Sequence, residues 1–255
     1  MRLSTRIRSS AMRLLASDFV LQRQRAKGRK QREAQGLEPV VYYFHQVDDP
    51  YSFIMAQQLT RFANIASVPI KPFLVSGPAA PFKGDATRFY AWAIADAANI
   101  APFLGETVPV TAGADTPTPP GDSQREAAQA ALSPLLDADL STFTAQAHRV
   151  GLALCQHDAM TMPNHQDRAH AATCIAAGDT LRESLGHFQG GTLYFDGEWY
   201  WGVDRLPLLL ARLIEEGHSQ ASVDDFDIYA AGSIKPLTVN AAVNRNITLE
   251  YFPSL

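Results

Sequence analysis

Residues 40–59 read VVYYFHQVDDPYSFIMAQQL, in which a run of β-branched and aromatic residues meets a proline-containing turn and then a helical pattern. The run at 40–44 has no polar alternation, which is typical of a central strand buried on both faces of a parallel α/β sheet. The next apolar run, VPIKPFLV at 68–75, predicts a second strand, and its two prolines favour an edge position. A strand, a helix and a strand in this order form a βαβ unit, whose crossover is right-handed.

The middle of the chain consists of segments with helical periodicity and no predicted strand. They span 85–104, 123–135, 141–155 and 165–185. Asp85 is placed to cap the first of them and Pro102 to end it. After them, GGTLYFDGEWYWG at 190–202 predicts a hairpin, because Asp-Gly between two aromatic-rich runs is a strong turn signal. A final amphipathic helix then ends at Gly217.

The predicted order is therefore β-α-β, a long helical insertion, and β-β-α, which is the order of the thioredoxin fold. The sequence predicts an α/β protein with a thioredoxin-like fold and an inserted α-helical domain. We expect a basic N-terminal helical arm at 1–37, a thioredoxin-like domain at 38–81 and 186–217, an inserted helical domain at 82–185, and a C-terminal extension at 218–255.

Composition is ordinary for a globular protein, since 46% of the 255 residues are hydrophobic and 19% are charged. No apolar run approaches the roughly 18 residues that a transmembrane helix needs, and no apolar core of a secretory signal follows the basic N-terminus. The two cysteines, Cys155 and Cys174, are far apart and suggest no disulfide framework. We therefore expect a cytoplasmic protein with no membrane span.

Residues 1–33 carry ten Lys or Arg against two acidic residues, which leaves about −12 on the rest of the chain. Such a run favours an anionic partner, namely nucleic acid, anionic lipid or an acidic protein, or else is a solvated helix. Apolar residues near helical spacing predict that the arm docks through an apolar stripe, made of Leu14, Leu15, Phe19 and Leu21. Its Arg-rich, acid-poor character also resembles an organellar transit peptide.

Two motifs, YYFHQVDDPYSFIMAQQL near the start and GEWYWGVDRLPLLLARL near the end, resemble the DsbA-like thioredoxin superfamily. The nearest branch is that of the 2-hydroxychromene-2-carboxylate isomerases and kappa-class glutathione transferases. The resemblance covers roughly residues 38–217, and its more specific part is Gly202-x-Asp204-Arg205-Leu206 after the hairpin. It implies glutathione as cofactor, a small aromatic or apolar substrate, and a homodimer.

Disulfide-exchanging members of that superfamily have C-P-x-C at the turn after the first strand, and the isomerase branch has S-P-Y. Here the matching residues are Asp49-Pro50-Tyr51-Ser52. Thiol–disulfide exchange needs a thiolate, which a carboxylate does not replace, so we expect no disulfide oxidoreductase activity. The resemblance makes Asp49, Tyr51 and Ser52 the candidate catalytic residues and places Pro50 in the cofactor-binding set.

The residues of this turn leave alternatives open. A helix N-terminus stabilises negative charge, so we expect Asp49 to have a lowered pKa and an electrostatic role, or simply to cap the helix with Pro50 at its first position. Ser52 either orients a thiol or caps the helix. Tyr51 either holds a ligand or packs as structure.

The resemblance also implies a glutathione site that includes Gly191, Thr192, Val203 and Asp204. Gly191 or Thr192 matches the cis-proline of the family, and a cis non-prolyl bond costs about 2.5–4 kcal/mol, so we expect a trans peptide and an altered ligand-pairing edge. Val203 and Asp204 match the stretch that holds the γ-glutamyl group, where Asp204 would pair with the ammonium. The alternative for Asp204 is an N-cap of the final helix.

A segment rich in histidine and cysteine lies at 155–174. His170 and Cys174 are four residues apart and would share a helix face as half of a zinc site. The full set, Cys155, His157, His165, His170 and Cys174, fits no standard zinc spacing, so we predict no metal site.

The tail NRNITLEYFPSL at 244–255 predicts a strand that echoes the run at 40–44. Either the chain is the first half of a tandem protein, with a second thioredoxin-like unit as partner, or this strand joins the sheet of its own domain.

The sequence leaves two candidate functions. The first is a glutathione-dependent isomerase or transferase acting on a small aromatic or apolar molecule. The second is a catalytically inactive thioredoxin-like half that serves as a binding or scaffold domain.

Overall fold

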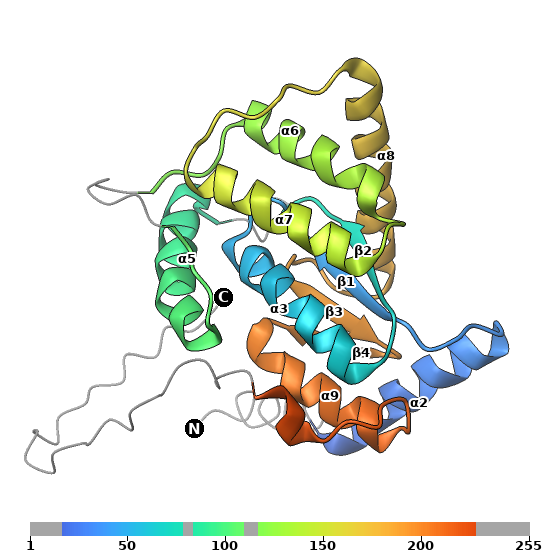
Figure 1. Ribbon diagram of the computed structural model, residues 1–255. Helices are drawn as coiled ribbons and strands as arrows, with labels where there is room; N and C mark the ends of the chain where they lie inside the picture. The colour runs from blue at the N-terminus through green and yellow to red at the C-terminus, as the bar shows by residue number, and fades with distance from the viewer. Residues whose placement is uncertain (1–16, 79–83, 110–116, 228–255) are drawn as a thin grey trace, which may run out of the picture.

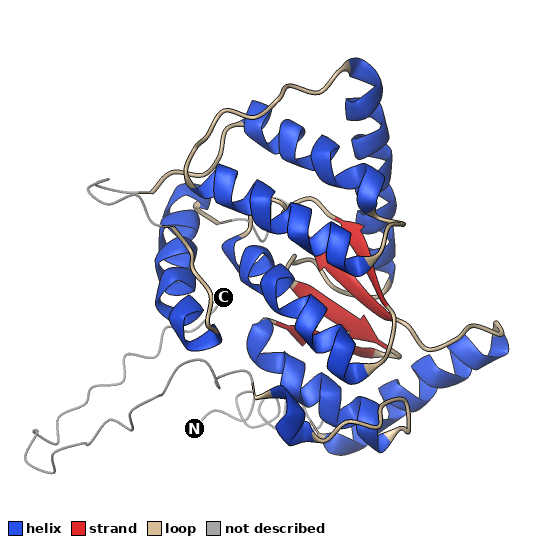
Figure 2. Cartoon of the chain, in the orientation of Figure 1, coloured by secondary structure: helices blue, strands red, loops and turns tan. Residues whose placement is uncertain are grey.

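The computed structural model describes residues 17–78, 84–109 and 117–227 of the chain. A four-stranded sheet lies between helices that cover both of its faces (Figures 1 and 2). The strands are β1 Val41–His45, β2 Ile70–Leu74, β3 Thr192–Phe195 and β4 Glu198–Trp201. Their order is β2-β1-β3-β4, with β1 parallel to β2 and with β3 antiparallel to both β1 and β4.

The helices form a layer on each side of the sheet, with α3 and α9 on one face and α8 on the other (Figure 1). The α-helices are α2 Asp18–Ala34, α3 Pro50–Ala66, α5 Ala86–Ile100, α6 Asp122–Leu132, α7 Leu140–Cys155, α8 His165–Ser184 and α9 Leu206–Glu215. Short 3-10 turns are η1 Ala101–Leu104, η2 Ser133–Leu135, η3 Val203–Arg205 and η4 Val223–Phe226.

Strand β3 is antiparallel to the other three strands. The helices from α5 to α8 lie between β2 and β3 in the chain. These two features, with helices on both faces, give the predicted thioredoxin-like fold with an inserted α-helical domain. The central strand is β1, whose Val41, Tyr43 and Phe44 are fully buried. The edge strand is β2, which accommodates Pro72 because an edge strand leaves one side of its backbone unpaired.

Most predicted helix boundaries agree with the structure to within a few residues. One helical segment ends at a different residue from the one predicted to end it. Asp85 caps α5 as predicted, since its Oδ1 accepts the Arg88 amide at 3.1 Å. Pro102 does not end that segment, because it lies inside η1. Gly105, in the left-handed region at φ 72°, ends it instead.

The predicted hairpin turn is confirmed at Asp196 and Gly197, which both have positive φ values of 36° and 86°. This is the geometry that favours Asp-Gly in a two-residue hairpin. The buried Arg212 of α9 holds the turn from behind, since it donates to the carbonyls of Phe195 at 2.7 Å and Asp196 at 3.0 Å. The turn is therefore fixed to the helix layer.

Helix α2 docks on this hairpin. Arg25 forms an ion pair with Glu198 at 2.8 Å, Arg32 forms one with Asp196 at 2.9 Å, and the backbone of Gly28 lies directly against the turn. Of the predicted apolar stripe, Phe19 is 65% exposed and Leu21 is half-buried, while Leu14 and Leu15 lie outside the described residues. Docking through the whole stripe therefore stays a prediction.

The start of the C-terminal extension packs on the helix layer. Phe226 of η4 is buried, meets the Phe62 ring edge-on at 5.3 Å, and lies under the Arg61 guanidinium at 4.8 Å. The predicted strand at 244–255, and with it the tandem hypothesis, falls outside the described residues.

The described ranges contain neither a membrane-spanning helix nor a metal-ligand cluster. No helix within them has both the length and the apolar character that a membrane span requires. His170 and Cys174 share a face of α8, with Nε2 and Sγ 3.6 Å apart, but these ranges contain no group of three or more such ligands.

Candidate functional site

The start of α3 is the point where the first predicted motif places its polar residues. Asp49 is the N-cap of α3, with Pro50 at the first helical position. Its Oδ1 accepts the Tyr51 amide at 3.3 Å, and its Oδ2 accepts the Ser52 amide at 2.9 Å and the Ser52 hydroxyl at 2.8 Å. The capping prediction is therefore confirmed, and the carboxylate holds three donors.

The pKa prediction for Asp49 is wrong in direction. Burial raises the pKa of this carboxyl to about 6, and the hydrogen bonds from Ser52 and Tyr51 offset only part of that rise. The helix N-terminus favours the charge by roughly 0.3–1 kcal/mol, which is less than the desolvation penalty of a buried carboxylate. The pKa of Asp49 therefore lies closer to neutral pH than that of an ordinary aspartate.

Two glycines before β3, Gly190 and Gly191, let the chain approach the start of α3 closely enough to bury the Asp49 carboxylate. A β-carbon placed on Gly191 would lie 3.1 Å from Asp49 Oδ2, and one on Gly190 would lie 2.6 Å from Gln46 Cβ. Gly191 has a φ of 62°, donates to the Phe44 carbonyl at 3.0 Å and accepts the Gly202 amide at 3.2 Å. The chain therefore passes directly over the carboxylate, where no side chain fits.

The predicted glutathione residues of this edge are turned away from a ligand. Both backbone polar groups of Gly191 are already bonded within the protein. Thr192 is fully buried and pairs in register with Phe44 and Trp201. The described residues contain no cis peptide, in agreement with the expected trans bond.

Val203 and Asp204 lie in η3, just beyond Gly202. Asp204 does not cap α9, because the N-cap of that helix is Arg205, whose side chain makes no capping bond. The Asp204 carboxylate is exposed, lies 3.3 Å from the Arg205 Nε, and folds back over Gly202. Since Gly202 bonds to Gly191, the structure brings Asp204 into the same region as Asp49, while the capping alternative is wrong.

Tyr51 connects the start of α3 to the helical insert. Its hydroxyl donates to Asp96 Oδ2 at 2.8 Å, and its ring lies 6.4 Å from that of Trp92. Burial and the Asp96 carboxylate raise the pKa of Tyr51, so its hydroxyl stays protonated. Phe89 and Trp92 on the same helix are 47% and 61% exposed, which leaves an aromatic surface next to the turn.

A buried chain of polar groups lies under the turn, and no local pattern in the sequence predicts it. The Tyr43 hydroxyl donates to the Ser52 carbonyl at 2.9 Å and lies 2.8 Å from His45 Nδ1. Because a phenol has one proton, His45 donates through Nδ1 to the Tyr43 oxygen. Burial lowers the pKa of His45 to about 3, which keeps the imidazole neutral.

The space beside Asp49 is small. A cavity of about 10 Å³ lies between α3, α5 and α7, with Asp49, Tyr90 and Cys155 among its lining residues. This is about the room that one water molecule needs. Burial raises the pKa of Cys155 to about 11, so this thiol is not a substitute for the missing nucleophile.

No family model and no curated protein matches the chain. Among solved structures, the chain is similar to that of selenomethionine 2-hydroxychromene-2-carboxylate isomerase, with 14% sequence identity and a TM-score of 0.49. The match covers 70% of this chain and 97% of that one. The fold assignment rests on the strand order and helical layers of the chain itself.

Proposed function

We propose that the protein binds a small aromatic or apolar molecule at the start of α3 and isomerises it by proton transfer through Asp49. In such a step the carboxylate takes a proton from one atom of the substrate and returns it to another, so that neither a thiol nor a redox partner is consumed. The position of the Asp49 carboxylate carries this proposal: it lies at the convergence of β1, α3 and the start of β3, and burial there raises its pKa.

Exposed aromatic side chains around that point support an apolar or aromatic substrate. Tyr51 and Trp92 lie on the side of the helical insert. Phe89 and Trp92 of α5 are 47% and 61% exposed beside it. Clusters of exposed aromatic residues on a soluble protein mark binding surfaces.

Glutathione enters this proposal as a second ligand, held by Val203 and by the exposed carboxylate of Asp204. An ammonium group would pair with that carboxylate, whose present neighbour is the exposed Arg205. Pairing of the glutathione backbone at Gly191 is not part of the proposal, because both polar groups of that residue are bonded.

A non-catalytic binding or scaffold domain is the second candidate. Three donors hold the Asp49 carboxylate, and the adjoining cavity has room for about one water molecule. Both observations are what a purely structural cap would give. A homodimer or a second thioredoxin-like unit would then be the partner.

The proposal is tested by following 2-hydroxychromene-2-carboxylate isomerisation by absorbance, with and without glutathione. We expect Asp49→Asn to lower the rate by about 10²-fold or more, as loss of a general acid or base does. Asp48→Asn, which removes the neighbouring carboxylate, is the matched control and should keep most of the rate.

Calorimetric titration with glutathione, repeated on Asp204→Ala, tests the cofactor separately. Heat with the native protein and none with the variant supports the Asp204 contact. No turnover of the isomerase substrate by the native protein, together with no glutathione heat, would favour the scaffold candidate.

A further inference from the structure

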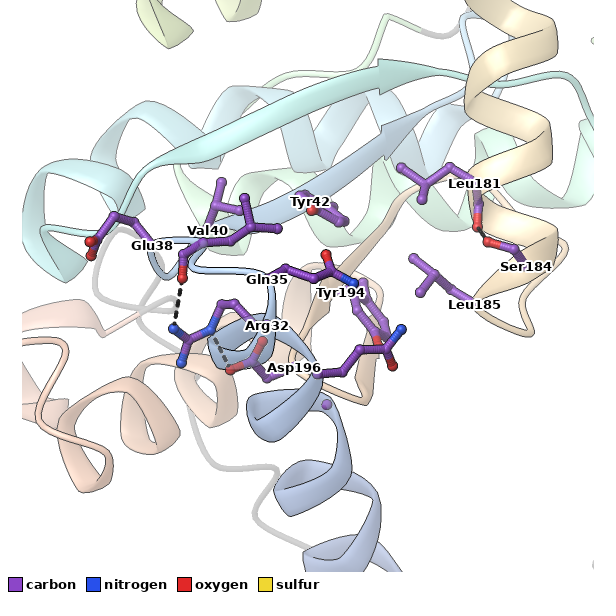
Figure 3. A pocket seen from close by; sticks show the side chains of 13 residues that line it. Arg32, Gln35, Glu38, Val40, Tyr42, Leu181, Ser184, Leu185, Tyr194 and Asp196 are labelled. Atoms are coloured by element: carbon purple, nitrogen blue, oxygen red, sulfur yellow. Dashed lines mark hydrogen bonds and ion pairs between the residues drawn. The ribbon is translucent and has the colours of Figure 1, made fainter.

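A second cavity lies on the opposite face of the sheet from Asp49. It has a volume of about 270 Å³ and is enclosed by α2, the start of β1, β3 and the end of α8 (Figure 3). This is many times the space beside Asp49 and is close to the lower end of the range of small-molecule sites, about 300–1,000 Å³.

The floor of this cavity is aromatic and fixed. Tyr42 and Tyr194 are register partners on β1 and β3, and their rings stack at 6.3 Å with 22° between their planes. Phe73 meets the Tyr42 ring edge-on at 5.3 Å, and Trp199 lies 5.0 Å from the Tyr194 ring. Because neighbouring rings contact both tyrosines, their positions are set before any ligand arrives.

The two walls differ in chemistry. On one side, Leu181 and Leu185 are one turn apart on α8 and present aliphatic side chains (Figure 3). On the other side, Arg32 of α2 donates to Asp196 Oδ2 at 2.9 Å and to the Leu37 carbonyl at 3.2 Å. These bonds fix the guanidinium as part of the wall.

The charges at this cavity argue against an ionic ligand. The positive charge of Arg32 is already paired with Asp196, whose side chain is 7% exposed. The remaining charged group of the lining is Glu38, which is exposed and would repel an anion. A cation would be attracted by Glu38 and the tyrosine rings, but it would have to approach the fixed guanidinium of Arg32.

We propose that this cavity is a ligand site for one uncharged, planar aromatic molecule of one or two rings, stacked on Tyr42 and Tyr194. The ring would lie between the tyrosine floor and the leucine wall, where it loses apolar surface to water. Since the floor is on the α8 face and Asp49 is on the α3 face, this site is separate from the one proposed for catalysis and does not depend on it.

The test is a fluorescence titration of the full chain with 6-propionyl-2-dimethylaminonaphthalene, an uncharged, planar two-ring probe whose emission shifts to shorter wavelength in apolar surroundings. Ser184→Trp places an indole at the mouth of the cavity and should weaken binding by about tenfold or more. Glu183→Trp, the adjacent exposed position that does not line the cavity, is the matched control and should leave the affinity within about twofold.

A third variant separates the two faces of the sheet. Trp92→Ala removes an exposed aromatic residue beside the catalytic candidate and should leave probe binding unchanged. Loss of binding with Trp92→Ala but not with Ser184→Trp would place the probe on the α3 face and overturn the proposal. Absence of probe binding by the native chain would overturn it as well.

Discussion

Two of the aspartates that cap helices in this protein, Asp49 and Asp139, differ in their pKa. Asp49 caps α3 and Asp139 caps α7, and each accepts a backbone amide and a side-chain hydroxyl from the first turn of its helix. The pKa of Asp139 is lowered to about 2, chiefly by hydrogen bonds from Ser141 and Thr142. Burial instead raises the pKa of Asp49 to about 6.

The difference shows that the capping motif alone does not set the proton affinity of its carboxylate. Asp139 faces solvent, so its hydrogen bonds outweigh the desolvation of its carboxylate. Asp49 lies under Gly191, which arrives from a segment more than 100 residues later in the chain. The same local interactions therefore give a structural cap at α7 and a group that titrates near neutral pH at α3.

Removing the close approach at Gly191 should have the largest effect. In Gly191→Ala the new methyl group lies 3.1 Å from Asp49 Oδ2 and 3.2 Å from the Ser52 amide nitrogen, in a residue with positive φ. We expect the free energy of unfolding to fall by about 2–3 kcal/mol, from backbone strain and overpacking together, as measured by urea denaturation.

Gly36→Ala is the matched control for that substitution, since Gly36 has a similar φ of 65° and no atom within 4 Å of the new β-carbon. Its loss should be about 1 kcal/mol, from backbone strain alone. Equal losses for the two variants would show that Gly191 does not seal the carboxylate.

The sequence predicted the features that are encoded locally. The strand at β1, the Asp-Gly turn and the Asp-Pro cap each depend on neighbouring residues, and the order of these elements was sufficient to predict the thioredoxin-like fold. The pKa of Asp49 was predicted with the wrong sign because it depends on Gly191, which no local pattern connects to the turn.

Long-range contacts also hold features that the sequence did not predict. Helix α2 docks through Arg25 and Arg32, whose partners Glu198 and Asp196 are more than 160 residues away. An apolar stripe is readable in a sequence, whereas the partner of an arginine is not. The cavity on the α8 face likewise requires the register that pairs Tyr42 with Tyr194.

The pH dependence of stability should have opposite signs at the two caps. The folded pKa of Asp49, about 6, is above its ordinary value of 3.8, so the folded state binds more protons between these values. Its contribution to the free energy of unfolding therefore falls as pH rises from about 4 to about 6. The folded pKa of Asp139, about 2, is below 3.8, so its contribution is present above that value and is lost as pH falls toward 2.

Urea unfolding at a series of pH values, on the native chain and on Asp49→Asn and Asp139→Asn, measures both contributions. Asp49→Asn should remove the decline between pH 4 and 6 and be at least as stable as the native chain at pH 7. It should also lose isomerase activity, which a purely structural cap would not predict. A decline of the Asp49 contribution on acidification would contradict the raised pKa.

The smallest effect concerns the hydroxyl groups that donate to the two caps. Ser52→Ala removes the hydroxyl donor to Asp49 Oδ2, and because this bond favours the charged form, the pKa of Asp49 should rise further. Ser141→Ala does the same at Asp139, whose pKa should rise from about 2 toward its ordinary value. Carboxyl ¹³C chemical shifts followed through a pH titration measure both. If Ser52→Ala lowered the pKa of Asp49, the hydroxyl would be accepting rather than donating, and the assignment of Asp49 as the proton-transferring group would lose its geometric basis.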